Sequence, residues 1–162
     1  MILYHFTAGQ YLRGIAAHGL TVGDVPTDLR KNSGVIGVWF TSAKIEEGHG
    51  LVGSALDKKR YRLKVDVPEV GLHRWREWAA TNVAQNTVEA LRQADGAGDR
   101  TWYIFFGCVD PDRIVEVVDL ATSEAVPDWP NAWPLANSRP GVRFEDRFVW
   151  HERLLQNVWS RM

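Results

Sequence analysis

Residues 60–67 alternate between apolar and charged side chains, with Tyr61, Leu63, Val65 and Val67 at one set of positions and Arg60, Arg62, Lys64 and Asp66 at the other. A period of two predicts a β-strand with one buried and one solvent-facing side. Pro68 follows directly and ends the strand, because proline has no N–H to donate to a neighbouring strand. Such a strand is stable only in a sheet whose buried face is covered by other elements.

The chain length fits one such layered domain over residues 1–162, because 162 residues can bury a core without disulfide or metal staples. Cys108 is the single cysteine, which excludes an internal disulfide framework and a zinc site built from a cysteine cluster. We expect no metal cofactor. The formal net charge of −1 argues against a broad electrostatic footprint for duplex nucleic acid. The first residues lack a signal-peptide pattern, and the apolar run 102–109 is too short to cross a bilayer. We therefore expect a cytoplasmic protein that does not contact membranes.

Apolar periods and turn residues predict the remaining elements. We expect strands at residues 2–6, 38–41, 102–109 and 114–120, a helix at 8–18, and either one long or two short helices from 72 to the glycines at 96 and 98. Thr7 is the expected N-cap of the first helix. The other segments are a long loop at 21–37, a glycine-spaced stretch at 48–53, an irregular proline- and tryptophan-containing segment at 121–141, and an amphipathic helix at 143–160. This order favours an α+β fold, with a split mixed or antiparallel sheet and flanking helices.

Several signatures of common enzyme classes are missing from the sequence, among them GxGxxG, the P-loop, HExxH, GxSxG and CxxC. One HxT motif occurs, at residues 5–7. Two-histidine phosphoesterases need this motif twice, so a single copy excludes that class.

Three short motifs together resemble the start of the ADP-ribosyltransferase fold: LYHFT at residues 3–7, HGL at 18–20 and GVWFTS at 37–42. The superfamily includes poly(ADP-ribose) polymerases, RNA 2′-phosphotransferases and DNA-targeting toxins. The similarity covers about the first quarter of the chain, and a weaker similarity follows later in the sequence. It implies two adjacent strands that splay apart and leave a cleft for a dinucleotide.

By this resemblance, His5 would hydrogen-bond a ribose hydroxyl of NAD+, with Thr7 supporting nearby contacts. Trp39 would stack on the nicotinamide ring where the family usually has tyrosine, and Tyr103 would be a further NAD+ contact. The alternative for His5 is a satisfied imidazole inside a strand, and the alternative for Trp39 is ordinary core packing. The nucleotide interpretation requires the two rings to face one cleft.

The family's catalytic glutamate usually begins a later strand, where it stabilises an oxocarbenium-like transition state. Trp102 stands at that position here, so the sequence departs from the pattern at its most informative residue. Asp99, Glu116 and Glu152 are the carboxylates that could take this role, although each also fits a solvated surface charge. Arg30 and Lys31 in the expected long loop could meet a pyrophosphate, or could simply be solvated.

Other conspicuous residues have structural explanations. The tryptophans at 75 and 78 share a helical face and are typical of a core stripe, while stacking on bases would need them exposed beside Arg74 and Arg76. The basic side of residues 60–64 fits a water-facing strand surface better than a phosphate contact. Cys108, inside an apolar run, is expected to be an inert buried thiol.

The first functional hypothesis is therefore an NAD+-dependent ADP-ribosyltransferase-like protein, which transfers ADP-ribose to an unknown protein or nucleic acid or hydrolyses NAD+. Such a protein would suit a bacterial or phage toxin, effector or counter-defence protein. The second hypothesis is a non-catalytic module that holds a nucleotide or a partner protein in the same cleft, as Trp102 at the acid position suggests. A phosphate-ester enzyme acting on RNA termini is a third, but the basic cluster it needs is not evident.

Overall fold

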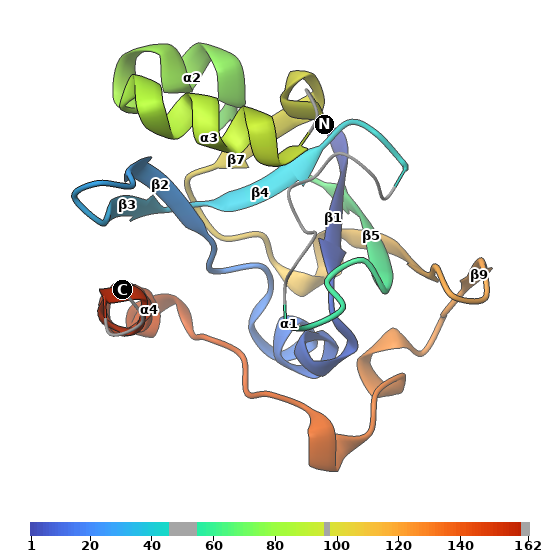
Figure 1. The fold of residues 1–162 in the computed structure, drawn as a ribbon. Coiled ribbons are helices and arrows are strands. Elements are labelled where there is room, and N and C mark those ends of the chain that lie inside the picture. The colour runs from blue at the N-terminus through green and yellow to red at the C-terminus, as the bar shows by residue number, and fades with distance from the viewer. Residues whose placement is uncertain (46–54, 96–97, 160–162) are drawn as a thin grey trace.

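The strand expected from the alternating segment is β5 (Tyr61–Asp66), and its side chains alternate between buried and half-buried. A computed structural model describes residues 1–45, 55–95 and 98–159 of the chain and shows a mixed α+β fold (Figure 1). Within these residues the main sheet has the strand order β6-β7-β4-β1-β5-β8-β9, and every pairing is antiparallel. The α+β architecture with an antiparallel sheet and flanking helices is thus confirmed.

The other strands of this sheet are β1 (Ile2–Thr7), β4 (Val38–Thr41), β6 (Leu72–Arg74), β7 (Trp102–Phe105), β8 (Ile114–Asp119) and β9 (Glu124–Ala125). A separate hairpin consists of β2 (Asp24–Asp28) and β3 (Ser33–Ile36). The α-helices are α1 (Leu12–His18), α2 (Trp75–Asn82), α3 (Gln85–Asp95) and α4 (Arg147–Trp159).

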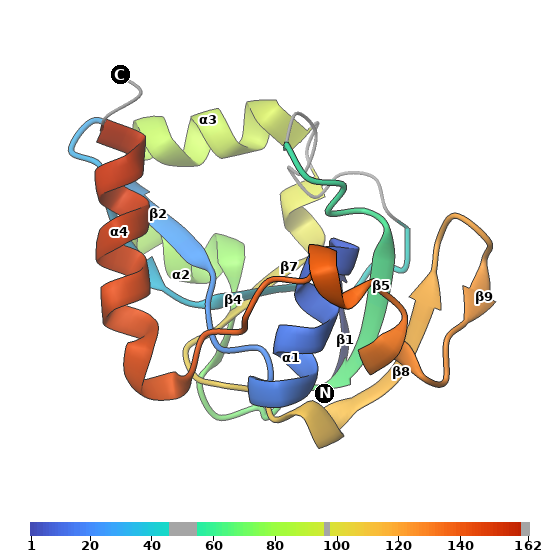
Figure 2. The same cartoon turned by 90° about the horizontal axis from the view of Figure 1, so that it is seen from below.

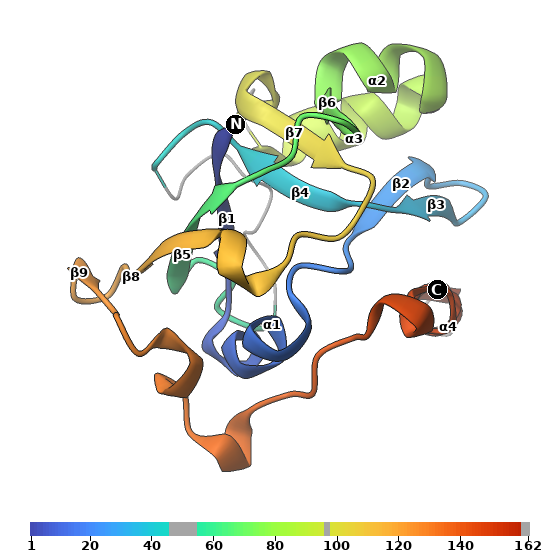
Figure 3. The same cartoon turned by 180° about the vertical axis from the view of Figure 1, so that it is seen from behind.

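The core has two parts, one on each side of the sheet (Figures 1 and 3). The larger part contains α1 residues such as Leu12 and Ile15 together with the buried face of β5. The smaller part centres on Trp75 of α2, which is 1% exposed and packs with Trp102 and Ile104 of β7. This burial supports the core-stripe interpretation of Trp75, while Trp78 is half-buried.

The largest correction to the sequence analysis is the expected loop at 21–37, which contains the β2–β3 hairpin. Asn32 adopts a positive φ of 49° at the turn, which is a conformation that asparagine tolerates well. The Thr87 side chain on α3 accepts a hydrogen bond from the Leu29 amide at 2.9 Å. The hairpin therefore depends on a partner that lies far along the chain, and local turn residues do not reveal it.

Smaller corrections concern element boundaries. Thr7 lies inside β1 opposite Tyr61 and does not cap a helix, because a 3₁₀ turn at 9–11 precedes α1 and has no side-chain cap. The helical segment expected from 72 begins with strand β6 and then forms two helices, α2 and α3. The strand expected at 102–109 ends at 105. Residues 121–141 form mainly irregular chain with short 3₁₀ turns, and the closing helix is α4 after a 3₁₀ turn at 144–146. The stretch 48–53 lies outside the described residues.

Helix α4 lies beside the hairpin, as Figure 2 shows from below. The ring of His151 pairs with the Asp24 carboxylate through Nε2 at 2.8 Å, and the Asn32 side chain donates to the Leu155 carbonyl at 2.9 Å. These two polar contacts fix the helix against β2 and the turn after it. In the three described segments no helix has the length and apolar character needed to cross a membrane.

Candidate functional site

The centre of the sheet is split between β1 and β4. Strand β1 pairs with β5 at six consecutive positions, from Ile2 with Asp66 to Thr7 with Tyr61. Strands β1 and β4, however, share one register pair among the described residues, Tyr4 with Thr41. The two strands therefore diverge after Tyr4, and His5 is the first residue of β1 on the diverging side.

His5 bridges this divergence through its ring. The imidazole Nδ1 lies 2.9 Å from the Trp39 main-chain oxygen, and the ring meets Phe40 edge-on with centroids 5.8 Å apart. Because a carbonyl oxygen can only accept, Nδ1 carries the proton. Burial lowers the pKa of His5 below 6.5, the charge of Lys58 acts in the same direction, and the bond to Trp39 opposes them. The ring is therefore neutral near pH 7 and Nε2 keeps its lone pair.

The Trp39 ring is packed against other side chains and is not placed to stack on a ligand as the resemblance had implied. Its indole Nε1 donates to the Asp24 carbonyl at 2.8 Å. Its ring packs against Trp75 and Trp102, at centroid distances of 4.9 and 5.6 Å. The indole is thus held among core aromatic rings, and Trp39 contacts His5 through its main chain.

The rings of His5 and Trp39 lie on opposite sides of the sheet. The His5 ring contacts Phe40, and successive side chains of a strand point to opposite faces. Phe40 belongs to the larger core and Trp39 packs against the smaller one. The expectation that the imidazole and the indole line one common slot is therefore corrected.

Thr7 and Tyr103 lie on the same face as His5. Thr7 is two residues further along β1, and Tyr103 of β7 is the register partner of Phe40. A row across the sheet therefore runs from His5 through Phe40 to Tyr103. Thr7 is 5% exposed and Tyr103 is 7% exposed, so both are packed into the core in this conformation.

The acidic candidates are not grouped with His5. Glu116 of β8 is exposed and pairs with Lys64, which is opposite Tyr4 and thus on the other face from His5. Asp99 lies in the 3₁₀ turn before β7, is 1% exposed and is engaged by arginines. Glu152 is exposed on α4. The structure therefore does not bring the expected catalytic carboxylates to the imidazole.

The basic loop candidates also lie away from His5. Arg30 is exposed in the β2–β3 turn, where its main-chain amide donates to the Asp28 carboxylate at 3.0 Å. The ammonium of Lys31 lies 3.9 Å from the same carboxylate. Neither side chain shares a described contact with the diverging strands.

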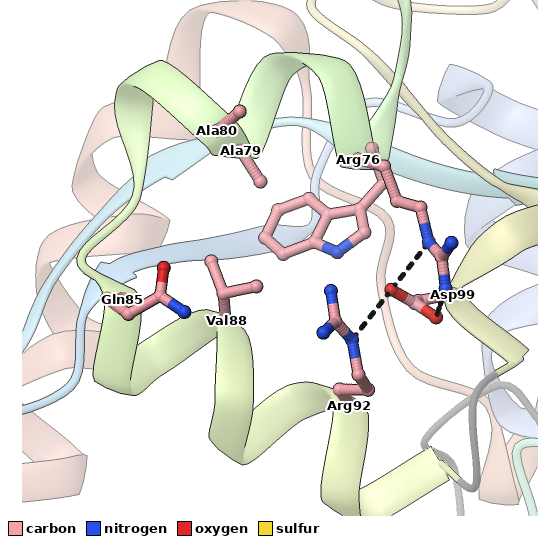
Figure 4. A pocket seen from close by; sticks show the side chains of 8 residues that line it. Arg76, Ala79, Ala80, Gln85, Val88, Arg92 and Asp99 are labelled. Carbon is pink, nitrogen blue, oxygen red and sulfur yellow. Dashed lines mark hydrogen bonds and ion pairs between the residues drawn. The ribbon is translucent and has the colours of Figure 1, made fainter.

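Sequence reasoning missed a charged cluster between α2 and α3. Arg76 and Arg92 both bind Asp99 at the edge of a cavity of about 180 Å³, which Figure 4 shows from close by. The two guanidinium groups lower the pKa of Asp99, with the Arg76 hydrogen bonds as the largest cause. No local spacing in the sequence relates Arg76 to Asp99, because they meet only once α2, α3 and the turn before β7 are assembled.

Cys108 is half-buried after β7, and burial raises the pKa of its thiol. A raised pKa keeps the thiol protonated and lowers its nucleophilicity. This is consistent with the expected inert role of Cys108.

Comparison with known proteins assigns no family. No family model matches the sequence, and no curated protein matches it. A solved structure described as EcPltA is similar over 88% of this chain and 89% of its own, with 13% sequence identity and a TM-score of 0.43. At that TM-score the likeness carries no argument about fold family or activity.

Proposed function

We propose a narrower form of the interpretation that the resemblance to the ADP-ribosyltransferase fold implies, in which the protein binds NAD+ where β1 and β4 diverge, with His5 as the anchoring residue and without the Trp39 ring. The two-ring cleft that this resemblance implies is not formed, because the Trp39 indole packs on the other face of the sheet from His5. The observation that supports the proposal is the state of His5: a neutral imidazole, fixed by the Trp39 carbonyl, at the point where the central strands separate. With Nδ1 engaged, Nε2 is the ring atom that accepts a hydrogen bond from a ribose hydroxyl.

We favour capture of NAD+ over rapid turnover. Separation of nicotinamide from ribose builds positive charge on the sugar, which a nearby carboxylate would stabilise. Asp99 is already held by two arginines, and Glu116 lies on the opposite face of the sheet. Trp102, which stands where the family's acid would be, contributes no charge and packs beside Trp39.

Transfer of ADP-ribose to a macromolecule, or hydrolysis of NAD+, is the second candidate, and the neutral state of His5 favours it. The bond between ribose C1′ and the nicotinamide nitrogen would break, with its electron pair leaving on nicotinamide. A water or acceptor group would form the new bond to C1′, and its proton would go to His5 Nε2. This chemistry requires the imidazole to be unprotonated, as burial favours.

Two assays on the same preparations distinguish these functions. Isothermal titration measures NAD+ affinity, and a nicotinamide-release assay measures turnover, for the unaltered protein and for His5→Ala. His18→Asn is the matched control, because His18 is exposed at the end of α1. We expect NAD+ binding that weakens at least tenfold in His5→Ala and is unchanged in His18→Asn.

The outcomes separate the candidates. Binding without nicotinamide release supports the binding module. Release that depends on His5 supports the enzyme, and identification of labelled acceptors would then follow. Absence of NAD+ binding by the unaltered, folded protein would overturn both.

A further inference from the structure

A second part of the molecule has the features of a ligand site and is independent of His5. The cavity of about 180 Å³ lies between α2, α3 and the turn before β7 (Figure 4). Its walls combine the Trp75 indole and the side chains of Ala79 and Val88 with the two arginines that hold Asp99. The proposed NAD+ function uses none of these residues.

The charges around this cavity do not balance. Asp99 is 1% exposed and receives hydrogen bonds from Arg76 Nε at 3.0 Å and from a terminal nitrogen of Arg76 at 2.7 Å. Arg92 Nε adds a longer bond of 3.4 Å to the same carboxylate. Among the described side chains that line the cavity, two guanidinium charges stand against one carboxylate and leave one excess positive charge. An anion in the cavity would offset it.

Hydrogen-bond donors remain for such an anion. Arg92 uses only its Nε on Asp99, so its two terminal nitrogens have no hydrogen-bond partner among the residues that the structure describes. The Arg92 and Arg76 side chains are 49% and 41% exposed, so a ligand can reach them. Because Asp99 already holds Arg76 through two hydrogen bonds and Arg92 through one longer bond, binding costs less side-chain ordering than at free arginines.

The rest of the lining selects the shape of the ligand. Trp75, Ala79 and Val88 supply the apolar part of the lining, and because Trp75 and Ala79 are each 1% exposed, only a small, thin apolar body fits beside them. The cavity is smaller than the roughly 300–1,000 Å³ usual for drug-sized ligands, so the ligand must be small. An arginine fork matches the planar geometry of a carboxylate.

We propose that the α2–α3 cavity binds a small planar carboxylate, whose acid group is bound by Arg92 and whose apolar body enters the space lined by Trp75, Ala79 and Val88. Gln85 is exposed at the start of α3 and lines the same cavity. Its amide nitrogen donates one hydrogen to the Glu89 carboxylate at 3.0 Å, and its second hydrogen can be donated to a ligand carboxylate oxygen that Arg92 leaves unpaired.

Benzoate is a suitable probe, and benzamide is its uncharged match in size and shape. Two-dimensional ¹H–¹⁵N NMR follows the indole N–H of Trp75 and the Nε–H of Arg92 during each titration. We expect saturable shifts of both signals with benzoate and at least tenfold weaker binding of benzamide. Arg92→Gln is expected to weaken benzoate binding at least tenfold. Arg100→Gln, which alters an exposed arginine that follows Asp99 in the same 3₁₀ turn and does not line the cavity, is expected to leave benzoate affinity unchanged.

Three results would overturn the proposal: no saturation by benzoate, equal affinities for benzoate and benzamide, or unchanged benzoate affinity in Arg92→Gln. Arg92→Lys serves as the second variant if Arg92→Gln lowers the thermal midpoint. Lysine keeps the charge but lacks the planar fork, so the same loss of affinity is expected. Failure of NAD+ to bind at His5 would leave this proposal intact, because the two sites share no residue.

Discussion

The Trp39 main-chain oxygen accepts a hydrogen bond from His5 Nδ1 at 2.9 Å, across the point where β1 and β4 diverge. One interaction thus fixes the tautomer and the orientation of the imidazole and also ties together two strands that share little ladder pairing. Because the contact is made by the main chain, the identity of the side chain at 39 matters to it only indirectly.

Replacement of His5 separates these structural and chemical roles. In His5→Asn the side-chain amide can take the place of Nδ1 and keep the bond to the Trp39 carbonyl, whereas His5→Ala leaves that carbonyl unpaired. We expect His5→Ala to lower the free energy of unfolding by about 1–3 kcal/mol and His5→Asn to lower it less. Urea unfolding of the three proteins measures the difference. Equal losses in both variants would argue against the hydrogen bond as the stabilising contact.

The lowered pKa of His5 makes stability depend on pH in a defined direction. The unfolded chain binds a proton near pH 6.5, while the folded protein resists protonation until a lower pH. The contribution of His5 to stability is therefore complete above about pH 6.5 and is lost as pH falls through the folded pKa. Unfolding free energies at several pH values from 7.5 to 5 test this. His5→Asn should flatten the profile in that window, and an unchanged slope would contradict the assignment.

Asp99 changes stability with pH in the same direction as His5, but in a lower pH range and for a different reason. Arg76 and Arg92 hold its pKa below 3.8, so its contribution is present above that value and is lost as pH falls through the folded pKa. Asp99→Asn should lower the free energy of unfolding by about 2 kcal/mol at pH 7, because it removes the charge from a buried group that accepts charge-assisted hydrogen bonds. Glu89→Gln, an exposed change on α3, is the control. A loss no larger than that of the control would contradict the prediction.

Thr87 links α3 to the β2–β3 hairpin. Its side chain is fully buried, and its hydroxyl oxygen accepts a hydrogen bond from the Leu29 amide at 2.9 Å. Thr87→Val keeps the shape but leaves that amide unpaired, so we expect a loss of about 1–3 kcal/mol. Hydrogen exchange at Leu29 should also become faster. In Thr87→Ser the hydroxyl is retained, and exchange at Leu29 should stay slow. Fast exchange in both variants would point to the methyl group instead.

The five consecutive central strands of the main sheet, β7, β4, β1, β5 and β8, are predictable from the sequence. Residues 60–67 alternate between apolar and charged side chains because one face of β5 is buried and the other is not. The position of this strand can therefore be predicted from its own residues. The residues of the β2–β3 hairpin show no such alternation. Its turn contains Asn32, Ser33 and Gly34, which are also typical of a loop, and its support comes from Thr87 and from α4.

The candidate site was predictable only in part. Sequence analysis selected His5 and Trp39, and these residues do make contact, but through a carbonyl that every residue carries. The direction of the Trp39 indole depends on Trp75 and Trp102, which come from distant segments. In the same way, Asp99 has no free carboxylate because two arginines from α2 and α3 reach it. These contacts join residues that are distant in the sequence and form only when the chain folds. Local patterns in one sequence therefore do not predict them.

The central claim is that NAD+ binds at the His5 imidazole, and NMR of the ring nitrogens tests it most directly. In protein labelled with ¹⁵N-histidine, His5→Asn identifies the His5 signals among the five histidines. The account predicts that NAD+ shifts the Nε2 resonance of His5 saturably, while Nδ1 keeps its proton and its bond to Trp39. An unshifted His5 Nε2 at NAD+ concentrations that saturate the protein by calorimetry would place the nucleotide elsewhere and contradict the account.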